Sequence, residues 1–158
     1  MVLATNANRV LPDFLASGQY RPRPSVATLA NAMDVGAPSN LERLQALFSA
    51  PASEVRADWV DDATIEARIR ETEARYGVAV CPHTACGLEV LARLRAGGLE
   101  GDFLVAATAH PAKFDTVVEP LVGHPVPPPP ALAALLARPS SARPLAATLQ
   151  ALGVALDA

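Results

Sequence analysis

The chain has 158 residues, a length that matches one domain with a single hydrophobic core. Its net charge of −3 argues against a nucleic-acid partner, because nucleic acid is bound by a basic face. No apolar run approaches the roughly 20 residues that span a membrane, and the first ten residues lack the pattern of a secretory signal.

Two helices are predicted in the first third of the chain. Residues 9–17 place their apolar side chains on one face, and Gly18 suits the position just after a helix. The next helix is predicted over 40–49, because Ser39 and Glu42 have the spacing of a capping box.

A longer helix is predicted over residues 62–76, with Asp61 or Asp62 as its cap and Gly77 after its last turn. Arginine and glutamate residues alternate over most of its surface, which is typical of a solvated face. One face of the helix is less charged and is formed by Ile65, Ile69, Thr72 and Tyr76.

The following segments alternate between strand and helix patterns. A β-branched run predicts a strand over 78–81, before Pro82, and a helix then runs from Thr84 to the glycines at 97–98. The apolar run at 103–108 predicts a buried strand, and a short helix follows over 112–119. This order favours an α/β layer architecture with parallel strands.

The last part of the chain breaks this order. Residues 124–130 read HPVPPPP, a polyproline segment that acts as a spacer or surface strap because proline cannot complete a sheet ladder. Two helical pieces are predicted after it, at 131–137 and 145–151. The expected division is therefore a main domain over 1–123 and a strap with a helical tail over 124–158.

The segment CPHTACG contains the densest group of reactive side chains. Cys81, His83 and Cys86 could be three zinc ligands, but the sequence offers no fourth ligand at a suitable spacing, so no metal site is predicted. Without an export signal, both cysteines are expected to be reduced thiols of a cytoplasmic protein.

Thr84 and His83 each have two interpretations. The Thr84 hydroxyl can cap its own helix, which the local sequence favours, or it can donate a hydrogen bond to a ligand where strands end and helices begin. His83 is either a partly buried imidazole with its own partners or a residue of such a site.

Two further segments carry groups of chemical interest. Lys113 is the only lysine, and it is either a Schiff-base nucleophile or a surface ammonium; the surface role is the commoner one. Asn6 and Asn8 precede a helix, where amides either help to bind an anion such as phosphate or cap the helix. The neighbouring His110 has no assigned role.

Three segments, taken in order, closely resemble the C-terminal part of the threonine synthase family: ATNANRVLPDFLASGQYRPRPSVATLANAMDVGAPSNLERL, CPHTACG and ATAHPAKF. The resemblance extends to about residue 150. It implies pyridoxal phosphate as cofactor and the conversion of O-phosphohomoserine and water into threonine and phosphate. It also implies part of the fold type II architecture, a partial three-layer sandwich with parallel strands and a helical C-terminal tail.

The resemblance assigns a role to Thr84, whose counterpart in the family's CPHTA-type motif hydrogen-bonds the pyridine nitrogen of the cofactor. It therefore reverses the interpretation that local sequence favours. Asn6 and Asn8 correspond to positions near the substrate and phosphate side of the cleft. The resemblance gives Lys113 no catalytic role.

The family's Schiff-base lysine and its SGNFG-type phosphate loop both precede the segments that match. The expectation from the resemblance is a chain that is inactive alone and needs an N-terminal partner chain. The alternative is a non-catalytic interaction module, or a subunit that associates with a partner or with itself.

Overall fold

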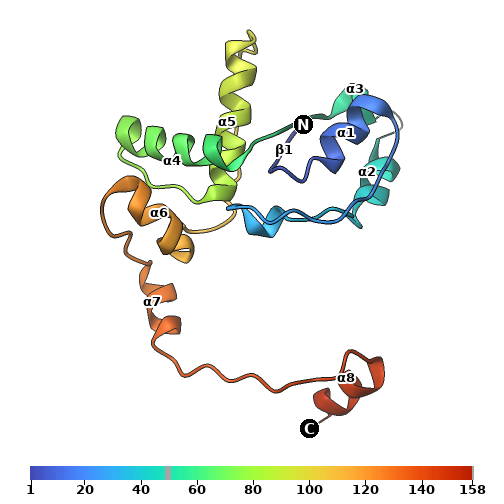
Figure 1. Ribbon diagram of the computed structural model, residues 1–158, viewed down its shortest axis with the longest axis vertical. Coiled ribbons are helices and arrows are strands. Elements are labelled where there is room, and N and C mark those ends of the chain that lie inside the picture. The colour runs from blue at the N-terminus through green and yellow to red at the C-terminus, as the bar shows by residue number, and fades with distance from the viewer. Residues whose placement is uncertain (49–50, 158) are drawn as a thin grey trace. The chain divides into compact units, whose positions relative to one another are not determined.

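The computed structural model describes residues 1–48 and 51–157. The chain divides into two compact units, Met1–Pro127 and Pro128–Ala158 (Figure 1). In chain order, the elements of the first unit are β1 (Val2–Thr5), α1 (Val10–Ser17), the 3-10 helix η1 (Asn31–Met33), α2 (Leu41–Leu47), α3 (Pro51–Glu54), β2 (Arg56–Trp59), α4 (Asp62–Tyr76), α5 (Pro82–Ala96), the 3-10 helix η2 (Pro111–Phe114) and α6 (Asp115–Val122).

The sheet is a parallel pair formed by β1 and β2, with Val2 opposite Arg56 and Thr5 opposite Trp59. Helix α1 packs against β2, and α5 packs against β1. The α/β class with parallel pairing is therefore confirmed, although the sequence patterns did not predict either of these strands. Each strand has 4 residues, which is too short for an alternating pattern of apolar and polar side chains to be recognised.

The two strands predicted from sequence are wrong: residues 78–81 and 103–108 form no strand. A strand needs a neighbour that completes its hydrogen-bond ladder. Within residues 1–48 and 51–157, the sheet contains β1 and β2 alone, so neither apolar run has such a neighbour.

The predictions for α1 and α4 are confirmed, although α1 begins at Val10, one residue later than predicted. The Thr64 N–H donates to the Asp61 carboxylate (2.8 Å), which caps α4. Gly18 and Gly77 end their helices with φ of 70° and 65°, a left-handed conformation that glycine adopts without steric cost. Tyr76 does not share the buried face, because its side chain lies exposed in the last turn.

The capping box predicted for α2 is wrong. The helix begins at Leu41, so Asn40 is its N-cap residue, and no side chain caps it. Ser39 therefore lies one position too early to bond the free N–H groups of the first turn. The helix ends at Leu47, and the last residue of the predicted range, Ser49, lies outside the described residues.

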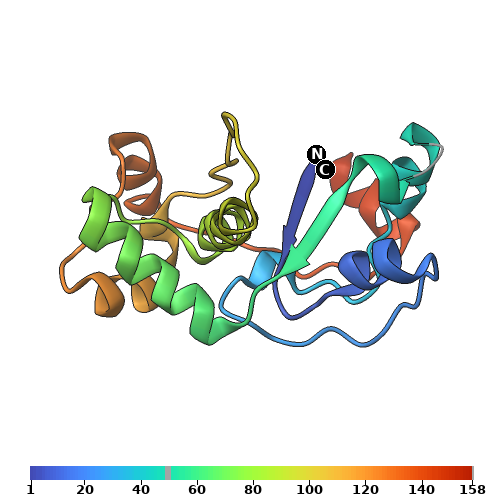
Figure 2. The same ribbon diagram turned by 90° about the horizontal axis from the view of Figure 1, so that it is seen from above.

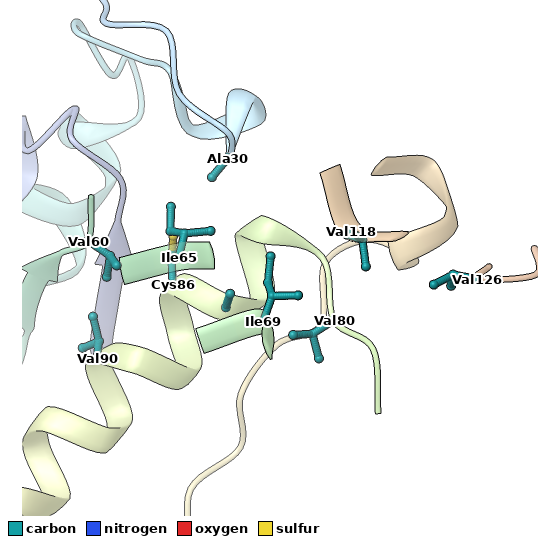
Figure 3. Close-up of a cluster of buried hydrophobic side chains, with 10 residues drawn as sticks. Ala30, Val60, Ile65, Ile69, Val80, Cys86, Val90, Val118 and Val126 are labelled. Carbon is teal, nitrogen blue, oxygen red and sulfur yellow. The ribbon is translucent and has the colours of Figure 1, made fainter. Parts of the chain in front are cut away.

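The hydrophobic core lies where α4, α5 and α6 meet (Figure 3). Ile65 and Ile69 of α4 are fully buried, as are Cys86 of α5 and Val118 of α6. Each large aliphatic side chain buried in this way contributes about 2 kcal/mol. This core fixes the position of α5, whose first turn carries the CPHTACG segment.

An ion-pair network also joins α4 to α5. Arg68 Nε donates to a Glu89 carboxylate oxygen at 3.0 Å, and Arg93 Nε donates to the other oxygen at 2.7 Å. Burial raises the pKa of Glu89, but the hydrogen bonds and charges of the two arginines outweigh burial, so the pKa lies below its ordinary value.

The segment after α5 departs from its predicted boundaries. The helix predicted over 112–119 is replaced by η2 and then α6, which ends at Val122. In the second unit, α7 spans Pro130–Leu136 and α8 spans Leu149–Leu156. Helix α8 begins later than predicted because the Thr148 hydroxyl accepts the Ala151 N–H (3.1 Å) and caps it there.

Candidate functional site

Helix α5 begins two residues earlier than its sequence suggests, with Cys81 as its N-cap residue and Pro82 in its first position. The Cys81 sulfur accepts the Thr84 N–H (3.5 Å), so Cys81 performs the capping that local sequence favoured for Thr84. Proline fits the first helical position because its missing N–H would have no intrahelical partner. Thr84 is thus held inside the first turn.

The Thr84 side chain is only 6% exposed. Its hydroxyl lies 3.3 Å from the Cys81 sulfur, and either atom can donate. A thiol is a weak hydrogen-bonding group, whereas a hydroxyl has one donor and two acceptor positions. The hydroxyl therefore retains the capacity to bind a stronger partner.

His83 connects the first turn of α5 to the loop that contains η1. Its Nε2 accepts the Ala32 N–H (3.0 Å), and its ring packs against Phe114 with the ring centres 4.9 Å apart. Because Nε2 accepts, the neutral ring carries its proton on Nδ1. Nδ1 is buried without a hydrogen-bond partner among the described residues. Burial lowers the pKa of His83, Asp34 partly opposes this, and Lys113 adds to it.

The two cysteines of the segment are buried. Burial raises the pKa of the Cys86 thiol to about 12, so this group stays protonated and is a poor nucleophile at neutral pH. Across residues 1–48 and 51–157, no cluster of three or more histidine, cysteine or acidic side chains is placed to hold a metal ion.

Asn6 and Asn8 are buried, and neither is a free amide as the sequence suggested. Asn6 Nδ2 donates to Asp34 Oδ1 (2.7 Å) and to the Ala30 carbonyl (3.1 Å). Asn8 Nδ2 donates to the Val26 carbonyl (2.8 Å), while its Oδ1 accepts the Val26 N–H (2.8 Å). These bonds fasten the loop around residues 24–34 to the end of β1.

Neither asparagine caps α1, whose N-cap residue is Arg9 and has no side-chain cap. Asp34 is the centre of their network and was missed from the sequence; it also accepts the Thr28 N–H at 3.0 Å. No local pattern indicates this role, because the side-chain donors Asn6 and Asn8 lie 28 and 26 residues before Asp34 in the sequence.

Lys113 has an exposed side chain in η2, as expected for a surface ammonium. His110 precedes it and caps η2, because its Nδ1 accepts the Ala112 N–H at 3.2 Å. The charge of Lys113 contributes to the lowered pKa of His83 in the first turn of α5.

A cavity of about 840 Å³ adjoins this region. Its walls are β1, the start of α1, the loop over 32–40, one side of α5 and the segment 103–108. Asn8 and His83 line it, but Thr84 and Asn6 do not. Of these four candidate residues, the structure therefore brings two to one cavity. It buries the other two, Asn6 and Thr84, in the protein interior.

Gly87 determines how closely the segment 103–108 approaches α5. A Cβ atom at this position would lie 2.9 Å from Val105 Cγ1, closer than such atoms pack. The glycine of CPHTACG is therefore required for the packing between α5 and the segment, which forms one wall of the cavity. In the described part of the chain, no helix has the length and apolarity to cross a membrane.

Comparison with known proteins gives a consistent result. Residues 84–153 match the family model for the C-terminal region of threonine synthase. Threonine synthase of Serratia marcescens is 43% identical over 136 residues, which cover 84% of this chain and 31% of the relative. The chain therefore spans about a third of the length of the curated relatives it matches.

Solved structures agree. Threonine synthase from Escherichia coli superposes with a TM-score of 0.83 at 36% identity, over 99% of this chain and 36% of that one. Threonine synthase from Brucella melitensis, solved with pyridoxal phosphate bound, gives a TM-score of 0.75 at 29% identity, over 89% of this chain and 36% of that one. In sequence and in fold, this chain belongs to the threonine synthase family and corresponds to its C-terminal part.

Proposed function

We propose that this chain forms the C-terminal part of a threonine synthase, the enzyme that converts O-phosphohomoserine and water into threonine and phosphate, and that it is inactive alone. The observation that carries the proposal is the agreement of fold with the Escherichia coli enzyme over almost the whole chain. The cofactor is pyridoxal phosphate, which the Brucella melitensis relative binds.

The chemistry of Thr84 fits this cofactor. The Thr84 hydroxyl can donate a hydrogen bond to a pyridine nitrogen, and its neighbour in the fold is the Cys81 sulfur. A neutral donor leaves that nitrogen unprotonated, whereas a carboxylate would favour protonation. Thr84 is therefore the residue of this chain that would hold the pyridine ring.

Pyridoxal phosphate supplies the electron sink of the reaction when it is bound. The residues of this chain orient the ring and shape the cleft. The first turn of α5 keeps the Thr84 hydroxyl in place, and His83 joins that turn to the loop at Ala32. Asn6 and Asn8 act indirectly, because their side chains hold the loop that His83 contacts.

The test is co-expression of the full chain with the part of the Escherichia coli enzyme that precedes its matched segment. We expect the mixture to form threonine and to release phosphate, and each chain alone to be inactive. The Escherichia coli enzyme divided at the same point serves as the positive control. An active control beside an inactive mixture, with both chains folded and associated, would contradict the proposal.

The role of Thr84 is tested in the same mixture. Thr84→Val removes the hydroxyl and keeps the shape, and we expect an activity loss of about tenfold, which corresponds to one hydrogen bond. Thr84→Ser keeps the hydroxyl and should retain most of the activity. Thr116→Val, an exposed site on α6, is the matched control. Equal activity of Thr84→Val and the unaltered chain would exclude the role.

A second candidate function is a non-catalytic interaction module. Its support is the number of large apolar side chains that are exposed, among them Leu104, Leu135 and Leu149. Threonine formation in the co-expressed mixture separates the two functions, since a module binds its partner without turnover.

A further inference from the structure

The polyproline segment 124–130, which follows α6, is attached to the first unit near its beginning. Figure 2 shows the chain after α6 turning past the last turn of α4. There, Nε2 of His124 lies 2.9 Å from a carboxylate oxygen of Glu73, a residue of α4. The Val126 N–H donates to the Glu119 carboxylate of α6 (2.8 Å). The start of the segment therefore has a polar contact with each of these two helices.

The imidazole ring of His124 lies between two oxygen atoms that can only accept hydrogen bonds. Its Nε2 faces the Glu73 carboxylate, and its Nδ1 lies 3.0 Å from the Pro125 carbonyl oxygen. A neutral imidazole has one N–H group and one lone pair, whereas the imidazolium ion has two N–H groups. Both contacts are therefore hydrogen bonds only when His124 is protonated. Loss of the proton directs a lone pair at an oxygen and removes one of the two bonds.

The surroundings of His124 favour its protonated form. The hydrogen bonds to Pro125 and to Glu73 raise its pKa above the ordinary value of 6.5, desolvation opposes them, and the charges of Glu73 and Glu119 raise the pKa further. These two carboxylates belong to α4 and α6, the helices that the segment contacts. Glu73 Oε2 is buried and has no hydrogen-bond partner among the described residues. A partly desolvated carboxylate of this kind needs a counter-charge, which the His124 imidazolium supplies.

The attachment holds Val126 in the hydrophobic core. Val126 is 8% exposed and belongs to the same buried cluster as Ile69 and Val118. Figure 3 shows its side chain pointing toward Val118 of α6. The first unit ends one residue later, at Pro127. The attachment of residues 124–127 therefore decides whether the fixed part of this unit extends to Pro127 or stops at the end of α6.

We propose that His124 is a pH-sensitive clasp: its imidazolium ion holds residues 124–127 on α4, and deprotonation releases them. Because the pKa of His124 is raised in the folded chain, the stabilisation is fully present below 6.5 and is lost as the pH rises through the raised folded value. Release separates the Val126 N–H from Glu119 and exposes the valine side chain to water. The clasp is independent of the function proposed above, because it needs neither cofactor nor turnover.

NMR titration of the full chain measures the pKa of the His124 ring, with His124→Gln to assign its signal, and we expect a midpoint above 6.5. Amide hydrogen exchange is then measured on both sides of that midpoint and expressed as protection relative to an unstructured peptide. We expect the protection of Val126 to fall about two- to fivefold as the pH rises, the range for one exposed ion pair. The Gly123 N–H is the internal control, because it donates to the Glu119 carbonyl (2.8 Å) at the end of α6 and its protection should not change.

A pair of glutamate variants separates the clasp from a general effect of charge. Glu73→Gln keeps the shape of the side chain and removes its charge, so we expect the His124 midpoint to move down toward 6.5 and the pH dependence at Val126 to weaken. Glu71→Gln is the matched control, because it makes the same change on the same helix. Glu71 pairs with Arg68 (3.0 Å), and its replacement should leave both measurements unaltered.

Three outcomes would overturn the clasp: a His124 midpoint at or below 6.5, equal protection of Val126 on the two sides of the midpoint, and an unchanged midpoint in Glu73→Gln. An equal loss of protection at Val126 and Gly123 would also overturn it. That result would mean that the end of α6 loosens as a whole, with no separate release of residues 124–127.

Discussion

Helix α5 borders two apolar regions that differ in how completely they are covered. Toward α4, the core around Ile65, Ile69 and Val90 is closed, and the ion pair between Arg68 and Glu89 lies beside it. Toward the segment 103–108, apolar side chains of α5 line an open cavity. The uncovered segment 103–108 reads FLVAAT and is more apolar than the charged helix α4, so composition does not explain the difference.

The two regions differ in the neighbours available to them. Helix α4 satisfies its own backbone hydrogen bonds, so it can cover α5 with only its apolar face. The segment 103–108 needs a second strand before it can form a ladder, and no described segment provides one. A helix can therefore complete the closed region locally, whereas no described segment of the chain gives the open region a strand to pair with.

Truncating a core side chain should destabilise the closed region. Ile69→Ala deletes part of a fully buried side chain of α4 and leaves a cavity, so we expect a loss of about 2–5 kcal/mol in the free energy of unfolding. Chemical denaturation followed by circular dichroism measures it. Tyr76→Ala, in the exposed last turn of the same helix, should change stability by less than about 0.5 kcal/mol. Equal losses would refute the assignment of the core.

Loss of the polar network at the end of β1 should also lower the free energy of unfolding. Asn6→Ala leaves the Ala30 carbonyl and the Asn8 N–H without their described partners, and we expect a loss of about 1–3 kcal/mol. Hydrogen exchange should become faster at Thr28, because Asp34 would be held less firmly. Unchanged exchange there would show that Asn6 does not hold this loop. The exposed Asn31→Ala serves as the control.

The ion pairs of Glu89 predict that the free energy of unfolding depends on pH. Because the pKa of Glu89 is lower in the folded chain, its stabilisation is present above its ordinary pKa of 4.5 and is lost as the pH falls through the lowered folded value. Glu89→Gln should cost about 1–2 kcal/mol at neutral pH and lose less stability on acidification. Unfolding curves at neutral and acid pH test this; parallel pH profiles for the two chains would count against it.

The open region should tolerate the same kind of change that breaks the core. Leu104→Ala removes a side chain that is fully exposed, so we expect the free energy of unfolding of the isolated chain to change by less than about 0.5 kcal/mol. Measuring Leu104→Ala and Ile69→Ala in one denaturation series compares the loss in the free energy of unfolding at the exposed and the buried position. A loss above 2 kcal/mol would mean that Leu104 is covered in solution.

Several elements of the fold could be predicted because their signals are local. Asp61 and Gly77 mark the ends of α4, and each acts within one turn of the helix. Thr84 and Cys81 show the limit of such signals. Both side chains can accept a bond at the start of a helix, and the position at which α5 begins decided that Cys81 is the cap. The buried network of Asp34 joins residues too far apart in sequence for any local pattern.

By itself, the sequence determined the α/β class, the helices with clear caps, the exposed position of Lys113 and the resemblance to the threonine synthase family. Only the tertiary structure decided that β1 and β2 pair, that Asn6 and Asn8 are enclosed and that 103–108 remains unpaired. The physical reason is the range of the interactions. A helix and its caps are formed within a few residues, whereas a strand or a buried amide takes its partner from elsewhere in the chain.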